Sequence, residues 1–183
     1  MNLADKHIVL GITGGIAAYK APFIVRGLTA AGAQVQVVMS ANAHEFVTAT
    51  SLQAVAGTPV RDNLWDHAAE AAMGHIELAR WADLLLVAPA TADLIARLAA
   101  GRADDLLTTT ALATAAPLLL APAMNADMWA NPICQRNLSL LRELLPNLSE
   151  VGPEEGWQAC RTTGGGRMSE PEAIRDAIAG LLR

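Results

Sequence analysis

Cysteine is scarce in this chain of 183 residues, which contains only Cys134 and Cys160. Two cysteines are too few for a disulfide framework, and charged residues interrupt the apolar N-terminus, so it lacks the pattern of a signal peptide. No apolar run approaches the roughly 18 residues that a transmembrane helix needs. We therefore expect a cytoplasmic protein with reduced thiols.

The chain also contains few aromatic residues, and its basic residues are outnumbered by acidic ones. Aromatics make up 4% of the chain and hydrophobic residues 52%, so the core must be built from Ala, Leu, Ile and Val. The net charge of −5 leaves no basic stripe for nucleic acid. No two residues among the His, Cys and Asp residues have the sequence spacing of metal ligands, so no metal site is predicted. The length fits one domain over residues 1–183.

Strand and helix signals alternate along the chain. The predicted strands are residues 7–12, 34–39, 83–88 and 117–121. The predicted helices are residues 16–31, 50–56, 76–81, 91–100, 104–115, 131–145 and 171–182. This alternation predicts an α/β fold with a doubly wound parallel sheet. Residues 151–170 lack periodicity and are expected to form a long functional loop.

Adjacent glycines follow the first predicted strand, in Thr13-Gly14-Gly15. Such glycines let the backbone approach a ligand, and the N–H groups of the following helix can hold a phosphate. With Ser40 ending the second strand and Thr91 following the third, three hydroxyls would gather at one sheet edge. That edge fits FMN better than a dinucleotide, because no acidic residue ends the second strand. A plain tight turn is the alternative.

The segment Pro-Ala-Met-Asn-Ala-Asp-Met-Trp, residues 122–129, follows the strand predicted at 117–121. Loops at the carboxyl end of such a strand carry ligand sites in open α/β sheets. Asn125 would offer an uncharged amide to an anionic substrate group. Apolar walls would come from Met124, Met128 and Trp129.

Two further segments carry candidate chemistry. His75 follows Gly74 directly before a predicted helix, where its ring could project from the helix start; a surface or capping histidine is the alternative. Residues 156–168 contain Cys160, three successive glycines and Arg167. The glycines suit a mobile lid that presents Cys160 to a substrate, and Arg167 could meet a phosphate or carboxylate. A flexible loop with a chance cysteine is the alternative there.

Taken together, these segments resemble the homo-oligomeric flavin-containing cysteine decarboxylases. Within that family they are most similar to the enzymes that act on phosphopantothenoylcysteine, the decarboxylase half of a bacterial bifunctional coenzyme A biosynthesis protein. The motifs that carry the resemblance are Gly14-Gly15, Gly74-His75, Pro122-Ala123-Met124-Asn125, and Cys160 with Gly166-Arg167-Met168. It covers residues 6–182 and implies a flavodoxin-like, Rossmann-like three-layer α/β/α sandwich. FMN would lie at a subunit interface, in trimers assembled into dodecamers.

The resemblance also implies roles for individual residues. His75 would be the catalytic base, Asn125 the carboxylate-binding amide and Cys160 the proton donor of the reductive step. His75 and Asn125 are expected to hold opposite ends of one cysteinyl group beside the flavin. The FMN contacts would be Thr13, Gly14, Gly15, Ser40, Ala90, Thr91, Ala92, Asp93 and Ala123. Arg161 stands where the family commonly has glycine.

The implied reaction is FMN-dependent decarboxylation of 4′-phosphopantothenoylcysteine to 4′-phosphopantetheine. Flavin would oxidise the cysteinyl thiol, CO2 would leave, and the enethiol would be reduced again. A peptidyl-cysteine decarboxylase, a flavin prenyltransferase and a non-catalytic FMN-binding regulatory subunit remain as alternatives. The chain could stand alone or belong to a longer protein with a phosphopantothenate–cysteine ligase domain.

Overall fold

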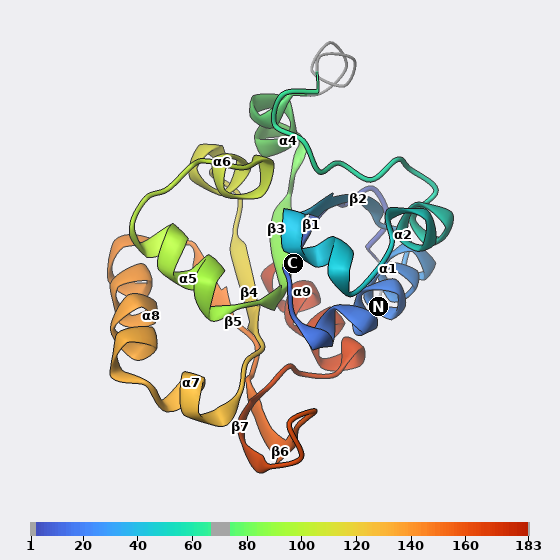
Figure 1. Ribbon diagram of the computed structural model, residues 1–183. Coiled ribbons are helices and arrows are strands. Elements are labelled where there is room, and N and C mark those ends of the chain that lie inside the picture. The colour runs from blue at the N-terminus through green and yellow to red at the C-terminus, as the bar shows by residue number, and fades with distance from the viewer. Residues whose placement is uncertain (1–2, 67–73, 183) are drawn as a thin grey trace.

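The centre of the molecule is a five-stranded, fully parallel sheet. The computed structural model describes residues 3–66 and 74–182, and Figure 1 shows the sheet between its flanking helices. The strand order is β2-β1-β3-β4-β5. The strands are β1 (His7–Ile12), β2 (Gln34–Met39), β3 (Leu84–Ala90), β4 (Leu118–Pro122) and β5 (Leu148–Glu150). This order is that of flavodoxin-like folds, so the predicted fold class is confirmed.

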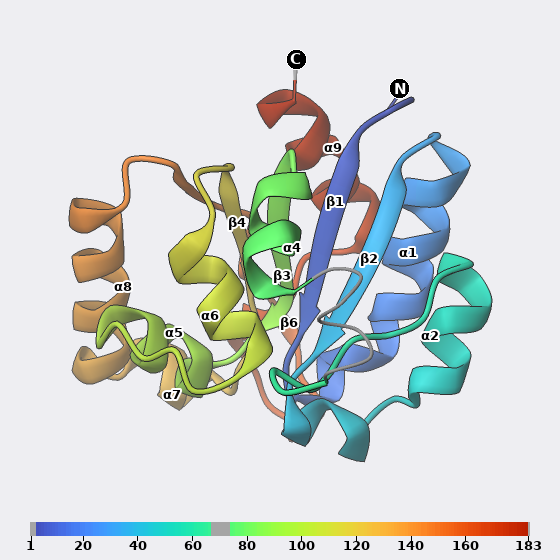
Figure 2. The same ribbon diagram turned by 90° about the horizontal axis from the view of Figure 1, so that it is seen from above.

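Helices cover both faces of the sheet and complete three layers (Figure 2). One face carries α1 (Ala21–Ala30), α2 (Ala49–Ala56) and α9 (Pro171–Leu181). The other face carries α4 (His75–Trp81), α5 (Ala92–Ala99), α6 (Leu106–Ala113) and α8 (Pro132–Leu144). Within the described ranges, no helix is both long enough and apolar enough to cross a bilayer.

The core is divided by the sheet into two apolar clusters. Along β1, Ile8 and Leu10 join the cluster beneath α1 and α9, whereas Val9 joins the cluster beneath α5 and α6. All residues of β3 are buried, as expected for a central parallel strand covered on both sides. Both clusters consist mainly of aliphatic side chains, which fits the low aromatic content.

Two predicted elements differ from the observed ones near the ligand edge of the sheet. The helix predicted at 16–31 is divided into a 3₁₀-helix, η1 (Ile16–Lys20), and α1. Pro22 explains the break, because proline has no N–H for the preceding turn and is tolerated only in the first turn of α1. The third strand does not end before Pro89 but continues to Ala90, with a shift of register against β4 after Val87.

The prediction of a long loop at residues 151–170 is wrong, because most of this segment forms an antiparallel hairpin. Its strands are β6 (Glu154–Trp157) and β7 (Thr163–Arg167). The hairpin packs on α7 (Ala126–Ala130), a short helix that the sequence also did not predict (Figure 1). Neither strand has an apolar alternation, so its position depends on this tertiary contact. A further 3₁₀-helix, η2 (Ala41–Glu45), follows β2.

Candidate functional site

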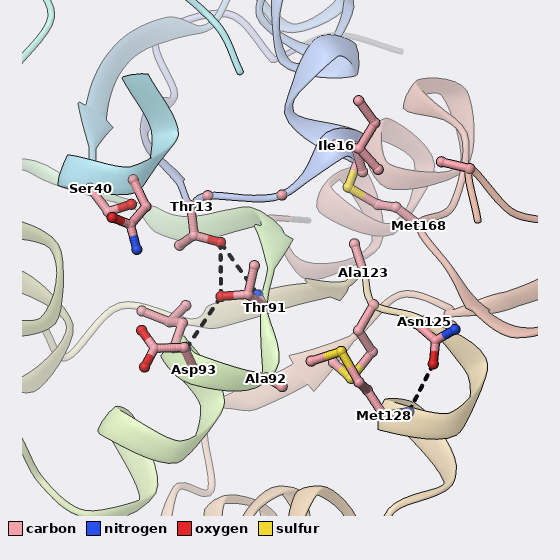
Figure 3. A pocket seen from close by; sticks show the side chains of 18 of the residues that line it. Thr13, Ile16, Ser40, Thr91, Ala92, Asp93, Ala123, Asn125, Met128 and Met168 are labelled. Carbon is pink, nitrogen blue, oxygen red and sulfur yellow. Dashed lines mark hydrogen bonds between the residues drawn. The ribbon is translucent and has the colours of Figure 1, made fainter. Parts of the chain in front are cut away.

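A cavity of about 1330 Å³ lies at the carboxyl edge of the sheet (Figure 3). The loop after β1 and the loop after β3 form its inner wall, so it occupies the point where the strand order reverses direction. Doubly wound sheets bind their ligands at this switch point. The 123–128 segment and the β6–β7 hairpin form the outer wall.

All three predicted hydroxyls line the cavity, and two of them are in contact. The Thr13 hydroxyl donates to the Pro89 carbonyl over 2.6 Å and lies 3.3 Å from the Thr91 hydroxyl. Thr91 in turn accepts from the Leu94 N–H and caps α5. Ser40 lines the same cavity, and its side chain makes no cap hydrogen bond to η2. Thr13 and Thr91 therefore tie the two loops together, while Ser40 can turn to a ligand.

Gly14 and Gly15 bring the backbone close to neighbouring loops, as the sequence predicts. A Cβ on Gly14 would lie 2.4 Å from the Cβ of Asn42, and one on Gly15 would lie 3.4 Å from Thr91 Cγ2. Asn42 also lines the cavity, and the sequence analysis missed it, although it lies only two residues after Ser40. The narrow glycine turn, the hydroxyls and the volume together suit the phosphate and ring of FMN.

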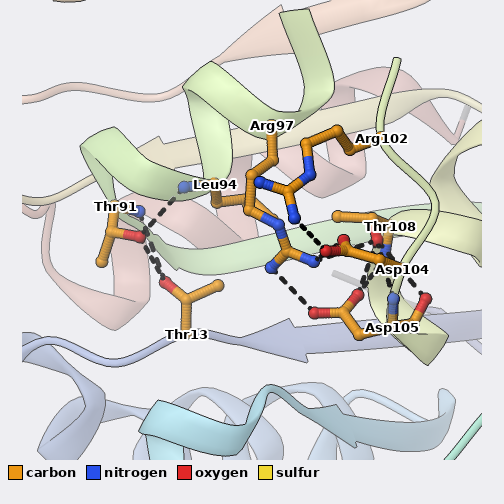
Figure 4. Close-up of polar contacts among 8 residues, drawn as sticks. All are labelled: Thr13, Thr91, Leu94, Arg97, Arg102, Asp104, Asp105 and Thr108. Carbon is orange, nitrogen blue, oxygen red and sulfur yellow. Dashed lines mark hydrogen bonds and ion pairs between the residues drawn. The ribbon is translucent and has the colours of Figure 1, made fainter. Parts of the chain in front are cut away.

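The far rim of the cavity is braced by ion pairs (Figure 4). Arg97 on α5 binds Asp105 over 2.9 Å and also contacts Asp104. Arg102 contacts Asp104 as well. The hydrogen bond from Arg97 holds the pKa of Asp104 below its usual range. Because each charge has a partner, this rim fixes α5 against α6 rather than offering a free cation.

Asn125 and Cys160 are in contact at the outer wall. Asn125 Oδ1 accepts from the N–H groups of Asp127 and Met128, over 2.8 and 3.2 Å, and so caps α7. This leaves Nδ2 as the group of the amide that faces outward, and it donates to Cys160 Sγ over 3.5 Å. The contact joins two residues that are 35 positions apart in the chain. The structure thus brings together two of the three predicted catalytic side chains.

The Cys160 thiol is exposed and polarised. Its Sγ lies 3.0 Å from the Thr162 hydroxyl, and this hydrogen bond, followed by the one from Asn125, lowers the pKa of the thiol. Burial instead raises the pKa of the Cys134 thiol, which packs beside Met124. The two cysteines therefore differ as the sequence predicts, with Cys160 in the site and Cys134 in the core.

The glycines of β7 allow the hairpin to approach α7 closely. A Cβ on Gly166, which has φ +107°, would lie 2.4 Å from the Met124 carbonyl oxygen, and one on Gly164 would lie 2.7 Å from Ala126 Cβ. The Met124 N–H donates to the Gly166 carbonyl over 2.9 Å. The glycines are therefore needed because β7 packs directly on α7 and leaves no room for a side chain. At the hairpin turn, Arg161 takes φ +65°, a conformation in which glycine is less strained.

His75 lies apart from this pair. It begins α4 and lines a separate cavity of about 240 Å³, together with Gly74, Ile76, Glu77 and Arg80. Its Nδ1 is buried and has no hydrogen-bond partner among the described residues. The expectation that His75 and Asn125 face one shared cavity is therefore not met within a single chain. His75 is not among the residues that line the cavity of Asn125.

Three other expectations need correction. Ala90 is fully buried in β3, where its carbonyl accepts from the Ala123 N–H, so it does not line the cavity. Trp129 packs against Gly165 under the hairpin instead of forming a cavity wall. Arg167 lines the cavity, but its Nη groups bind Glu170 and Glu154 over 2.8 and 2.7 Å. A carboxylate on β6 and one at the start of α9 thus use the donors that were expected to hold a substrate anion.

The remaining predicted residues do line the cavity. They are Thr13, Gly14, Gly15, Ser40, Thr91, Ala92, Asp93, Ala123, Met124, Asn125, Met128, Cys160 and Arg167. Sequence reasoning missed Lys20, a buried lysine on η1 whose Nζ donates to the Met168 carbonyl and pairs with Glu170 over 3.0 Å. Its position at the end of η1 carried no motif. Gln158 was also missed, although it lies two residues before Cys160.

The fold and this cavity define a flavoprotein, and comparison with known families agrees. The chain matches the Flavoprotein family over residues 1–183 and belongs to it. It is 54% identical over 179 residues to the coenzyme A biosynthesis bifunctional protein CoaBC of Haemophilus influenzae. The match covers 98% of this chain but 44% of that relative, so the chain spans less than half the length of the relative.

Solved structures give the same assignment. A cysteine-to-serine mutant of PPC decarboxylase, complexed with pantothenoylaminoethenethiol, superposes with a TM-score of 0.82 at 31% identity. The match covers 95% of this chain and 96% of that one. The FMN-dependent cysteine decarboxylase SpaF gives a TM-score of 0.79 at 32% identity, covering 98% and 97% of the two chains.

Proposed function

We propose that this chain catalyses the FMN-dependent decarboxylation of 4′-phosphopantothenoylcysteine to 4′-phosphopantetheine, a step of coenzyme A biosynthesis. The observation that carries the proposal is the 3.5 Å contact between the Asn125 amide and the Cys160 thiol at a cavity of about 1330 Å³. The similarity to CoaBC and to PPC decarboxylase supports the substrate.

FMN would be held by Ser40, the Thr13-Gly14-Gly15 turn and the N-terminus of α5. The close packing of Gly14 and the uncapped Ser40 hydroxyl fit a phosphate group. Bound FMN would supply the two-electron oxidation that makes loss of CO2 feasible, and the return of those electrons. The net reaction is then a lyase reaction with no redox change.

Asn125 would orient the substrate carboxylate. Its Oδ1 is fixed by the cap of α7, so its Nδ2 donates to the carboxylate from a constant position. A neutral amide suits this task, because a cation would stabilise the charge that disappears when CO2 leaves. Cys160 lies within reach of the same group and would give its proton to the enethiol in the reductive step.

His75 would act as the base for the thiol proton from another copy of the chain. Its separation from Asn125 within one chain supports a site shared between subunits. Exposed apolar side chains beside the cavity support such an interface, with Ile16, Tyr19 and Phe23 each more than half exposed. The family resemblance suggests trimers assembled into dodecamers.

A longer natural protein is also proposed. Because the chain covers 44% of the CoaBC relative, a phosphopantothenate–cysteine ligase domain would occupy the rest of such a protein. It would supply the cysteinyl substrate to the site described here.

The direct test is incubation of the FMN-loaded protein with phosphopantothenoylcysteine, with CO2 and the thiol product followed by mass spectrometry. We expect CO2 and 4′-phosphopantetheine in equal amounts. A preparation that binds no FMN, or that releases no CO2, would refute the proposal.

Cys160→Ser separates the main alternative. A peptidyl-cysteine decarboxylase releases an oxidised enethiol and needs no proton from Cys160, so its product would be unchanged. The proposed reaction predicts that the variant still releases CO2, at most one per bound FMN, and that the enethiol accumulates in place of the saturated thiol. A prenyltransferase or a regulatory subunit would release no CO2 from this substrate.

A further inference from the structure

The side chain of Gln158 joins the two segments that carry Asn125 and Cys160. It is only 8% exposed, although its neighbours Trp157 and Cys160 are both exposed. Its Nε2 donates to the carbonyls of Met124 and Gly165, over 3.2 and 2.8 Å. Its Oε1 accepts from the Ala126 N–H over 3.1 Å. Both amide hydrogens and the oxygen are therefore engaged.

These bonds enclose the backbone of Asn125. The Met124 carbonyl and the Ala126 N–H are the polar groups of the peptide units on either side of Asn125, and one glutamine amide binds both. The third bond, to Gly165, ties the same amide to β7. The 123–126 segment and the hairpin are thus fixed in one register by a single side chain.

The backbone of Gln158 fixes the turn that carries Cys160. The Gln158 N–H donates to the Thr162 carbonyl, and the Arg161 N–H donates to the Gln158 carbonyl, each over 2.9 Å. The Cys160 Sγ lies 3.6 Å from Gln158 Oε1. One residue therefore holds the amide of Asn125 from one side and the thiol of Cys160 from the other.

We propose that Gln158 is a positioning residue that sets the distance between Asn125 and Cys160 for the reductive half of the reaction, a role that rests on the proposed function. After CO2 has left, bound FMN would return the two electrons that it took up in the first half, and the Cys160 thiol would supply the proton that the enethiol needs. The Cys160 thiolate that remains is then reprotonated by water. If Cys160 is displaced, the enethiol leaves before it is protonated.

The test compares Gln158→Met with wild type and with Gln135→Met. Methionine has a similar length but removes these three hydrogen bonds and the one that Oε1 accepts from Cys160 Sγ. Gln135 is a matched control, because its Nε2 donates to the Trp129 carbonyl at the other end of α7, over 2.6 Å. The measured quantity is the ratio of released enethiol to saturated thiol in a single turnover of FMN-loaded protein with phosphopantothenoylcysteine, because a protein that loses the enethiol keeps its FMN reduced.

We expect Gln158→Met to raise this ratio by roughly 10-fold, because small displacements of a reacting group slow its step. Gln135→Met should leave the ratio unchanged. A slower reaction with the wild-type ratio would overturn the proposal, since a merely structural role would lower both products together. If Gln158→Met does not fold, Gln158→Glu replaces it; this variant keeps the bond from the Ala126 N–H but loses both donations.

A second readout does not depend on the proposed function. The pH dependence of Cys160 alkylation by iodoacetamide is followed on the Cys160 peptide by mass spectrometry. A carboxylate in Gln158→Glu, placed beside the thiol, should shift the midpoint to higher pH. An unchanged midpoint would contradict the position of Gln158. Absence of any product from the wild-type enzyme would instead refute the proposed function and leave this result intact.

Discussion

The pair formed by Asn125 and Cys160 differs from His75 in how the chain positions it. The amide and the thiol come from segments far apart in sequence and meet at 3.5 Å, beside a large cavity. His75 lies at the start of α4, where the helix end is satisfied locally, since the Gly74 N–H donates to Glu77 Oε2 over 2.7 Å. One chain thus brings the amide and the thiol together, whereas His75 lines a different cavity, and the proposed function takes the imidazole from another copy.

The largest expected effect is that of His75→Asn. General acid–base groups contribute about 10² to 10⁴ in rate, so we expect kcat to fall by roughly 1000-fold. FMN content should stay the same, because the substitution leaves the predicted FMN contacts in the cavity wall unchanged. The rate of Cys160 alkylation should also be unchanged, which would show that the other half of the site is intact. Wild-type kcat in this variant would rule out His75 as the base.

Asn125→Asp tests the other half of the comparison. A carboxylate there would repel the carboxylate of the substrate, and we expect kcat/KM to fall by roughly 100-fold. The matched control is Asn131→Asp, because Asn131 caps α8 through a bond from the Ile133 N–H over 2.9 Å and an aspartate caps equally well. Steady-state measurement of kcat/KM for both variants would show whether the loss is specific to Asn125. An equal loss in Asn131→Asp would mean that an added negative charge near these helices, and not repulsion of the substrate carboxylate, causes the effect.

Much of the sheet and of its ligand edge could be predicted from the sequence. Apolar runs such as residues 84–88 fix the strands, and parallel strand ends must share an edge, so Thr13, Ser40 and Thr91 were expected to lie together. The β6–β7 hairpin could not be predicted, because its strands carry glycine and glutamate and depend on contact with α7. No local pattern could show that His75 lies in another cavity.

Gly166→Ala tests the docking of the hairpin, on which the 3.5 Å contact depends. At φ +107° and 2.4 Å from the Met124 carbonyl, the added Cβ forces a displacement. We expect a loss of about 2 kcal/mol in the free energy of unfolding, seen as a Tm lower by roughly 6 °C. Gly180→Ala in α9 is the control; no atom lies within 4 Å, so its Tm should not fall. A stable Gly166→Ala with wild-type product would show that close docking is not required.

The smallest expected effect concerns Glu170, which binds Lys20 and Arg167 at the base of the hairpin. The hydrogen bond from Lys20 is the main cause that lowers the pKa of the Glu170 carboxyl. A lowered pKa stabilises the fold above the ordinary carboxyl pKa, and this contribution disappears as pH falls through the lowered value. Glu170→Gln should therefore lower Tm at neutral pH by about 2 °C, since exposed pairs contribute little.

Thermal unfolding of wild type and Glu170→Gln across the acidic range checks that sign. The difference in Tm should shrink as pH decreases. A difference that is constant with pH would assign the effect to packing and not to charge.

The central claim is that the imidazole of one copy completes the amide–thiol site of another, and hybrid oligomers test it most directly. His75→Asn and Asn125→Asp chains, each expected to keep about 1% of wild-type activity or less, are co-expressed with different tags, and oligomers that carry both tags are purified with FMN bound. Random assembly of a shared site restores both native residues in about a quarter of the sites, so we expect about a quarter of wild-type activity. Hybrids as inactive as either parent would contradict the account.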